Sequence, residues 1–239
     1  MMRIFKPILA GGTFSDRLVA SLGALVCLSS TAAICLYVPL APGLPSIVAP
    51  LGASAVLVLA VPASPLAQPW SVIGGNSISA AVGVAAYHLI PEVSLASGIA
   101  VAAAILIMSL ARCLHPPGGA AALTAVIGTP GIHAMGFWFA LSPVALNSVL
   151  LVALGIVFHR LSGHAYPHRV SSPAQVQQEQ HAAGFAPEDI DAALAEMHET
   201  FDIAREDIEL LLARAEIHAR WRIAEPATRI KQPPSSGVS

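Results

Sequence analysis

Charged side chains are scarce in this sequence of 239 residues. Asp, Glu, Lys and Arg make up 11% of the chain, against roughly 25% in ordinary soluble domains. Hydrophobic residues make up 55%, and the mean hydropathy is +0.70. Only two charged residues, Glu92 and Arg112, occur in the 142 positions between Leu18 and His159. This scarcity excludes an ordinary water-soluble fold and predicts a membrane protein.

Aromatic residues and cysteines are also few. Aromatic residues make up 5% of the chain, and no basic stripe accompanies them, so nothing in the sequence supports a nucleic-acid partner. The three cysteines, Cys27, Cys35 and Cys113, lie in apolar segments. An odd number in such segments predicts small buried side chains rather than a disulfide framework.

Six apolar runs account for the hydrophobic excess, and proline and glycine separate them. Four are long enough to cross a bilayer: Leu18–Leu40, Ser71–Ile90, Leu95–Leu114 and Phe137–Phe158. Leu51–Val61 and Gly118–Gly128 are short, and a helix of 11 residues spans only about 17 Å of a hydrocarbon core about 30 Å thick. The first run exceeds the core of a signal peptide, so it is interpreted as an uncleaved transmembrane helix. The sequence predicts an all-α, polytopic membrane bundle of four long transmembrane helices and two short helices, broken or re-entrant.

The two short runs resemble each other. The segments Pro50–Pro62 and Pro117–Pro130 both open with small residues and close with proline, and an Asn-Ser pair follows each, at Asn76 and Asn147. The pattern suggests an internal repeat of three elements: long, short and long. Chance similarity between membrane segments rich in Ala, Gly and Pro is the alternative.

Basic residues flank the apolar region on both sides: Arg3, Lys6 and Arg17 precede it, and Arg160 and Arg169 follow it. Because such residues favour the cytoplasmic side, we expect a multi-pass protein of the cell inner membrane with both termini in the cytoplasm. An even number of crossings follows. Six crossings would make the repeats inverted and four would make them parallel, and the sequence leaves both open.

Composition changes after residue 161, because residues 170–239 carry 18 of the 26 charges. We expect a cytoplasmic N-terminus over residues 1–17, a transmembrane domain over 18–161, a polar linker over 162–186, a cytoplasmic two-helix segment over 187–222 and a disordered tail over 223–239. Two short amphipathic helices need a partner surface. The lipid bilayer and a second copy of the chain, bound through these helices, are therefore expected partners.

The string from Arg112 to Ala120 is the strongest candidate for a binding site. Its two prolines interrupt a helix, and the N-terminus of the next helix offers N–H groups and partial positive charge to an anion. A hinge with a snorkelling arginine and a capping histidine is the alternative, and interhelical hydrogen bonds are the alternative for the asparagines. The candidate substrate-binding residues are Gly52, Ala53, Ser54, Asn76, Arg112, His115, Gly118, Gly119, Ala120 and Asn147.

The breaks themselves form a second group of candidates, with a structural role. They comprise Pro62, Pro65, Gln68, Pro69, Gly74, Gly75, Pro116 and Pro117. Irregular backbone at membrane depth is tolerated only against protein or water. Trp70 and Trp138 are expected in the aromatic belt at the membrane surface.

Enzyme chemistry has little support. Cys113 and His115 are close in sequence, but no second histidine or carboxylate stands at the spacing of metal ligands or of a catalytic triad. We expect no enzyme, no cofactor and no metal. His159, His164 and His168 are interpreted as interfacial residues, with metal binding as the alternative.

Two segments resemble the signature motifs of the HPP family of integral membrane proteins: His115-Pro-Pro-Gly-Gly-Ala120, and Ser54 to Asn76. The likeness covers roughly Asp16 to Leu161. The family is usually described with four transmembrane helices, and nitrite transport has been assigned to plant and cyanobacterial members. The resemblance implies a permease for a small inorganic anion, with nitrite as the candidate.

The segment that begins at Asp189 resembles the helical connector to paired CBS domains in longer bacterial relatives. The sequence ends before such a pair, so the nucleotide-sensing role of CBS domains is not carried over from the resemblance. A membrane sensor or scaffold that signals or assembles through its C-terminal amphipathic helices is the alternative function.

Overall fold

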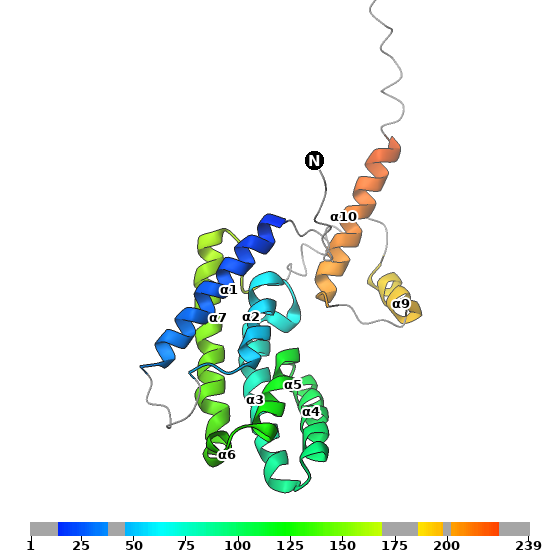
Figure 1. Ribbon diagram of the computed structural model, residues 1–239. Coiled ribbons are helices and arrows are strands. Elements are labelled where there is room, and N and C mark those ends of the chain that lie inside the picture. Colours follow the sequence, from blue (N-terminus) through cyan, green and yellow to red (C-terminus); the bar gives the residue numbers. More distant parts are fainter. Residues whose placement is uncertain (1–13, 38–45, 169–185, 198–201, 225–239) are drawn as a thin grey trace, which may run out of the picture. The chain divides into compact units, whose positions relative to one another are not determined.

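The computed structural model of the chain describes residues 14–37, 46–168, 186–197 and 202–224. Within these ranges every regular element is helical, and no strand occurs. The chain divides into two units, residues 1–169 and 170–239. The first unit is an apolar helical bundle and the second carries two tail helices (Figure 1). The predicted all-α membrane fold is confirmed.

Four helical segments of the bundle are long and apolar enough to cross a membrane. They are α1 (Phe14–Cys35), α3 (Pro69–Leu89), α4 (Val93–Leu110) and the segment Ala140–Ser162, which joins the π-helical turn η2 (Ala140–Ala145) to α7 (Leu146–Ser162). The shorter elements are α2 (Pro50–Ala60), the 3-10 turn η1 (Pro65–Ala67), α5 (Pro116–Ile127) and α6 (Pro130–Met135). The predicted combination of four long and two short apolar helices is confirmed, and α6 is an additional turn.

Prolines decide where several of these helices begin. Pro50, Pro69, Pro116 and Pro130 are the first residues of α2, α3, α5 and α6. A proline costs no hydrogen bond there, because the first N–H groups of a helix have no partner within it. By contrast, α4 begins after Glu92, whose carboxylate accepts hydrogen bonds from two backbone N–H groups of the first turn. These bonds lower the pKa of the Glu92 carboxyl below its usual value.

The short helix α2 carries the chain from one end of α1 to the other. Beside the start of α2, Asn147 of α7 accepts a hydrogen bond from the Val48 N–H (2.9 Å) and donates to Cys35 Sγ at the end of α1 (3.2 Å). At the end of α2, Arg17 from the start of α1 donates to the Ala60 carbonyl (2.9 Å). The two ends of α2 therefore lie beside opposite ends of α1.

The short helix α5 plays the same part in the second half of the bundle. The indole of Trp70 at the start of α3 donates to the Ala111 carbonyl at the end of α4 (3.1 Å). From there α5 runs alongside α3 in the same direction, so that Ala122 packs against Gly83. Counting α2 and α5, the described chain passes along the bundle six times.

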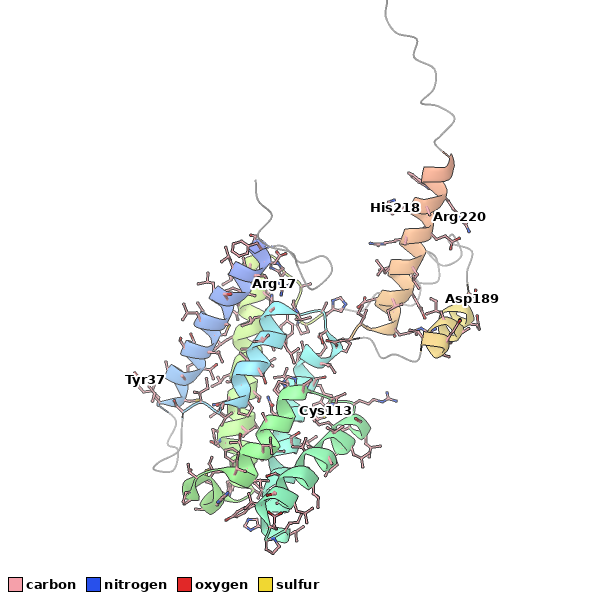
Figure 2. The ribbon with its side chains drawn as sticks, turned by 45° about the vertical axis from the view of Figure 1, so that its right-hand side comes forward. Arg17, Tyr37, Cys113, Asp189, His218 and Arg220 are labelled. Atoms are coloured by element: carbon pink, nitrogen blue, oxygen red, sulfur yellow. The ribbon has the colours of Figure 1, made fainter. Side chains whose placement is uncertain are left out.

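Charged residues of the described bundle lie at its two ends. Figure 2 shows Arg17 and Tyr37 at opposite ends of α1. Asp16, Arg17, Arg112 and Arg160 lie at the end where α1 and α3 start and where α4 and α7 finish, and Glu92 precedes α4 at the other end. None of these side chains is buried. The described interior therefore contains no Asp, Glu, Lys or Arg side chain.

Helix α3 lies at the centre of the bundle, where it packs against α4, α5, α7 and η2 (Figure 1). Of the membrane-length window in α3, 50% is buried inside the protein, against 22% in α4. Small residues on the face toward α5 allow this close approach. An added Cβ at Gly83, for example, would lie 2.2 Å from the carbonyl oxygen of Ala122.

The tail unit consists of α9 (Pro187–Met197) and α10 (Arg205–Ala224). Arg205 of α10 forms ion pairs with Asp191 of α9 and with Glu209 one turn further along α10. The hydrogen bond from Arg205 lowers the pKa of the Asp191 carboxyl. Most of the predicted linker, nearly all of the predicted disordered tail, and Arg3, Lys6 and Arg169 lie outside the described residues.

The substitution Gly83→Ala tests the packing of α3 against α5. The new methyl group would meet a backbone atom, and overpacking of this kind costs roughly 1–3 kcal/mol. We expect Gly83→Ala to lower the midpoint of thermal unfolding in detergent. Gly98→Ala in α4 is the matched control, because a Cβ there has no neighbouring atom within 4 Å. Equal midpoints for the two variants would contradict the close α3–α5 contact.

Candidate functional site

A chain of hydrogen bonds joins four buried side chains inside the bundle. They are Ser54 of α2, Asn76 of α3, His115 at the start of α5 and Ser148 of α7, each at most 2% exposed. The Asn76 amide nitrogen donates to the hydroxyl oxygens of Ser54 (3.0 Å) and Ser148 (3.2 Å). The Ser54 hydroxyl lies 2.8 Å from Nε2 of His115. These four residues are called the polar core below.

The contacts of His115 determine which ring nitrogen carries hydrogen. Nδ1 lies 2.8 Å from the carbonyl oxygen of Leu66, and a carbonyl oxygen can only accept, so Nδ1 must donate. In the neutral ring Nε2 is then the acceptor, and the Ser54 hydroxyl donates to it. Donation therefore runs from Asn76 to Ser54, from Ser54 to His115, and from His115 to Leu66.

The proline and glycine motifs hold His115 in this position. His115 has extended backbone angles (φ −144°, ψ 105°), because Pro116 and Pro117 begin α5 directly after it. Across the contact, Gly75 of α3 leaves room for the imidazole: an added Cβ there would lie 2.5 Å from Cβ of His115. Gly74 likewise approaches Cβ of Cys113.

The loop between α2 and α3 positions the Leu66 carbonyl. Pro65 begins the 3-10 turn η1, which contains Leu66. The side chain of Gln68 closes the loop by donating to the carbonyls of Pro62 (3.0 Å) and Ser64 (2.8 Å). Pro69 then begins α3. The residues predicted to have a structural role thus lie in or beside two breaks between helices. One is the α2–α3 loop, and the other is the α4–α5 loop, which contains His115.

Two buried polar groups next to the polar core have no partner among the described residues. They are the amide oxygen of Asn76 and the hydroxyl oxygen of Ser79, one turn further along α3. An added Cβ at Gly118 of α5 would lie 2.7 Å from Oγ of Ser79. Leaving a buried polar atom without a partner costs roughly 1–3 kcal/mol. The Ser79 hydroxyl can donate to a small anion, whereas the Asn76 oxygen needs a donor.

The first N–H groups of the short helices are already engaged. In α5, Pro116 and Pro117 have no N–H, and the Gly118 N–H bonds the His115 carbonyl (2.8 Å). In α2, the N–H groups of Leu51 and Gly52 bond carbonyls of the preceding turn. Donors for an anion inside the bundle are therefore side-chain groups, rather than the backbone groups that the sequence suggested.

The structure brings together only part of the predicted binding residues. Ser54, Asn76 and His115 form the polar core, and Gly118 is buried beside it. The others divide by exposure: Gly52, Ala53 and Ala120 are exposed, Gly119 is half-buried, and Arg112 is exposed at the end of the bundle.

Asn147 belongs to a different set of contacts. Besides Val48 and Cys35, its side chain bonds the Ser46 carbonyl (3.1 Å). These bonds join α7 to the end of α1 and to the segment before α2. Interhelical hydrogen bonding, which the sequence left as an alternative, accounts for Asn147.

Two groups of the site were missed by sequence reasoning. Ser148, the partner of Asn76, was not among the predicted binding residues, although its neighbour Asn147 was. The Leu66 carbonyl is a backbone group with no sequence signal. The pair at residues 147 and 148 did contain a signal, but only helix packing decides which of two neighbouring residues faces the interior.

Histidines outside the polar core contact neighbouring helices and loops. His159 Nε2 lies 2.9 Å from the Val58 carbonyl, and the rings of His159 and His164 are 6.0 Å apart. Trp70 and Trp138 are exposed at 57% and 69%. Within the described part of the chain, no group of three or more His, Cys, Asp and Glu side chains is arranged to hold a metal ion.

Membrane-length helices around a buried polar core define a polytopic α-helical integral membrane protein. Residues 10–167 match the family described as HPP, transmembrane region, and the chain belongs to this family. The membership agrees with the motifs around His115 and between Ser54 and Asn76.

Two similar proteins are known from Dictyostelium discoideum, and each is described as a transmembrane protein. One is 36% identical over 120 residues, which cover 48% of this chain and 42% of the relative. The other is 35% identical over 114 residues, which cover 46% of this chain and 36% of the relative. The chain thus spans less than half the length of these curated relatives. No solved structure matches it.

The substitution Ser54→Ala tests whether the hydrogen bonds of the polar core stabilise the bundle. It removes the partner of both His115 Nε2 and the Asn76 amide, and each unpaired buried group costs roughly 1–3 kcal/mol. We expect a lower thermal midpoint in detergent. Ser109→Ala is the matched control, because the Ser109 hydroxyl bonds only the carbonyl one turn back, on an exposed face. An equally small effect of both changes would contradict the network.

Proposed function

We propose that the chain is a permease for a small inorganic anion, with nitrite as the candidate substrate. The polar core carries this proposal, because polar side chains inside a membrane bundle are costly and mark pathways for polar solutes. Ser54, Asn76, His115 and Ser148 come from four separate segments and meet at one place. Membership of the HPP family supports the same function.

The donors of the polar core suit a small oxyanion. The two hydroxyls and the amide of Asn76 can each turn a hydrogen toward an oxygen atom. The nearby Ser79 hydroxyl has no partner among the described residues, so it is a further donor for the anion. We infer that the anion replaces the bonds that Asn76 makes to the two hydroxyls.

Three arginines at one end of the bundle extend the proposal to substrate capture. Arg17, Arg112 and Arg160 are all located at the end where α4 and α7 finish. Their combined positive charge raises the local concentration of anions at the entrance. By the positive-inside rule we propose that this end faces the cytoplasm, in a protein of the cell inner membrane. No enzyme activity is part of the proposal.

Uptake into liposomes tests the function. We expect purified protein to take up labelled nitrite faster than empty vesicles do. His115→Ala should reduce uptake by about tenfold or more, because losing a hydrogen bond worth 1–3 kcal/mol along the path slows transfer accordingly. Ser109→Ala should retain it. A folded sample with no uptake above empty vesicles would contradict the proposed function.

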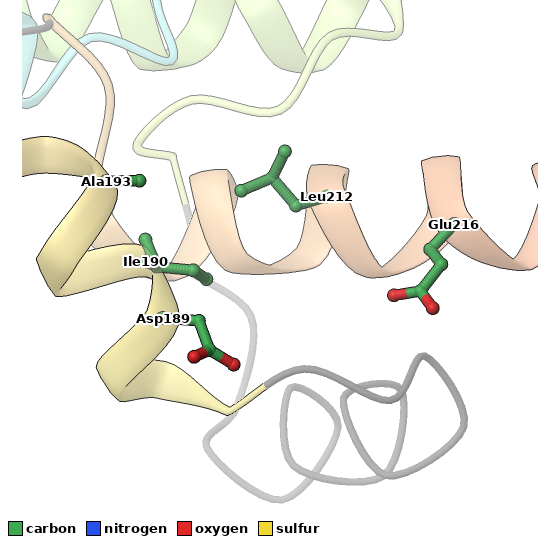
Figure 3. Close-up of a pocket in the computed structure, with 5 residues that line it drawn as sticks. All are labelled: Asp189, Ile190, Ala193, Leu212 and Glu216. Carbon is green, nitrogen blue, oxygen red and sulfur yellow. The ribbon is translucent and has the colours of Figure 1, made fainter. Parts of the chain in front are cut away.

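A second candidate function is a membrane scaffold that assembles through the tail unit. On α10, Leu211, Leu212 and Trp221 are 63%, 43% and 69% exposed. Figure 3 shows an open groove between α9 and α10, with Ile190 and Ala193 on one side and Leu212 on the other. Asp189 and Glu216 complete its lining. The exposed apolar side chains favour a partner.

The charges of α10 favour a second copy of the chain as that partner. The first half of the helix carries three acidic and two basic residues, and the second half carries one acidic and two basic residues, so two antiparallel copies would bring halves of opposite net charge together. The acidic residues are Glu206, Asp207, Glu209 and Glu216, and the basic residues are Arg205, Arg214, Arg220 and Arg222.

Deletion of residues 171–239 separates the two functions. A permease should keep nitrite uptake without the tail, whereas a scaffold should change from dimer to monomer, as measured by light scattering in detergent. Leu211→Asp in the full chain should also weaken the dimer, and Ala195→Asp on an exposed face of α9 is its control. A full chain that is monomeric throughout would contradict the scaffold.

A further inference from the structure

We propose that His115 takes up a proton at Nε2 when the polar core binds an anion, so that each nitrite ion crosses the membrane with one proton. This inference rests on the proposed function and names its coupling ion. Three observations carry it. The described interior of the bundle contains no charged side chain, one ring nitrogen of His115 can take up a proton, and the Ser54 hydroxyl has two acceptors within reach.

The first observation is the lack of a counter-charge for an anion. Every Asp, Glu, Lys and Arg of the described bundle lies at one of its ends, and none is buried. Arg112, which the sequence placed beside His115, is exposed. A lone anion in an uncharged, apolar interior is strongly disfavoured, because low dielectric removes its solvation. A positive charge within the polar core would offset that cost.

The second observation concerns which groups near the anion could supply this charge. His115 is the histidine of the polar core and is 0% exposed. The elements packed around it contribute the Ser54 hydroxyl, the Leu66 carbonyl and, through Ser54, the amide of Asn76. The thiol of Cys113 in the same loop is also titratable and buried, but it gains no positive charge on protonation.

The protonation site on His115 follows from its contacts. Nδ1 donates to the Leu66 carbonyl in either charge state, so the ring cannot turn this nitrogen toward the anion without losing a bond. The second proton must therefore form an N–H bond at Nε2, the atom that faces Ser54 at 2.8 Å. The imidazolium then presents its new hydrogen toward the polar core.

The third observation explains how the network accepts this change without moving its heavy atoms. In the neutral state the Ser54 hydroxyl donates to Nε2. When Nε2 is protonated, the hydroxyl can donate instead to the Pro50 carbonyl, 3.3 Å away. Its oxygen then accepts from Nε2, and the Asn76 amide, released from Ser54, donates to the anion. Ser54 is thus a hydrogen-bond switch with a second acceptor in place.

The proton balance of the cycle is simple. Water on the side of entry supplies the proton, which forms the N–H bond at Nε2 of His115 as the anion binds. After the anion leaves on the opposite side, this N–H bond breaks and the proton passes to water there. The Ser54 hydroxyl returns to Nε2. Transport moves one anion and one proton in the same direction, and no net charge.

Proteoliposomes that contain the full chain and a pH-sensitive dye test this coupling. The membrane potential is set with potassium and valinomycin, and values from empty vesicles are subtracted. We expect the initial rate of nitrite uptake to be independent of the potential and the proton-to-nitrite ratio to be close to one. Uptake that follows the potential without proton movement would overturn the inference and leave the permease. No uptake at all would overturn both.

His115→Gln distinguishes the proposed proton carrier from a proton carried by the substrate itself. Glutamine keeps hydrogen-bonding capacity but cannot become cationic. We expect its residual uptake to depend on the potential and to move no protons. A ratio still close to one would overturn the role of His115. His133→Gln is the control, since His133 contacts residues outside the polar core. Its ring stacks on Tyr87, and Nε2 bonds the Val126 carbonyl. If His115→Gln does not fold, His115→Asn, whose side chain is also unable to become cationic, replaces it with the same two outcomes.

Discussion

The need to pair buried hydrogen-bond donors inside an apolar bundle governs this structure, and the amide nitrogen of Asn76 shows how it is met. Its amide is buried at the centre of α3 and bonds side chains from α2 and α7. Because water and lipid offer no substitute partner there, the amide fixes how the helices must face one another. The position of Ser54, and through it the ring of His115, depends on this one interaction.

Close packing of α3 makes the arrangement possible. Glycines at residues 75 and 83 let the α4–α5 loop and α5 approach the α3 backbone more closely than side chains would allow. The two prolines after His115 end the loop and begin α5, so the imidazole enters the bundle from a fixed backbone. A membrane interface built of small residues thus supports a polar site, in a bundle where apolar contacts alone provide little specificity.

Hydropathy and proline positions were sufficient to predict the four long and two short apolar helices. Both signals depend only on residues that are close together in the sequence. Proline fixes the first residue of α2, α3 and α5. The site was only partly predictable, because helix packing decides which side of a helix faces the interior of the bundle. Ser54 is buried, whereas Ala53 on the same helix is exposed. Arg112 is three positions from His115 in sequence, yet one is exposed and the other buried.

The central claim is that His115 forms a switchable hydrogen bond with Ser54, and nuclear magnetic resonance of 15N-labelled histidine tests it most directly. His115→Gln assigns the resonances. Our account predicts a neutral ring with hydrogen on Nδ1 and an unprotonated, hydrogen-bonded Nε2 in the absence of an anion, with Nε2 gaining hydrogen when nitrite is added. A ring that carries hydrogen on Nε2 alone, or that does not respond to nitrite, would contradict it.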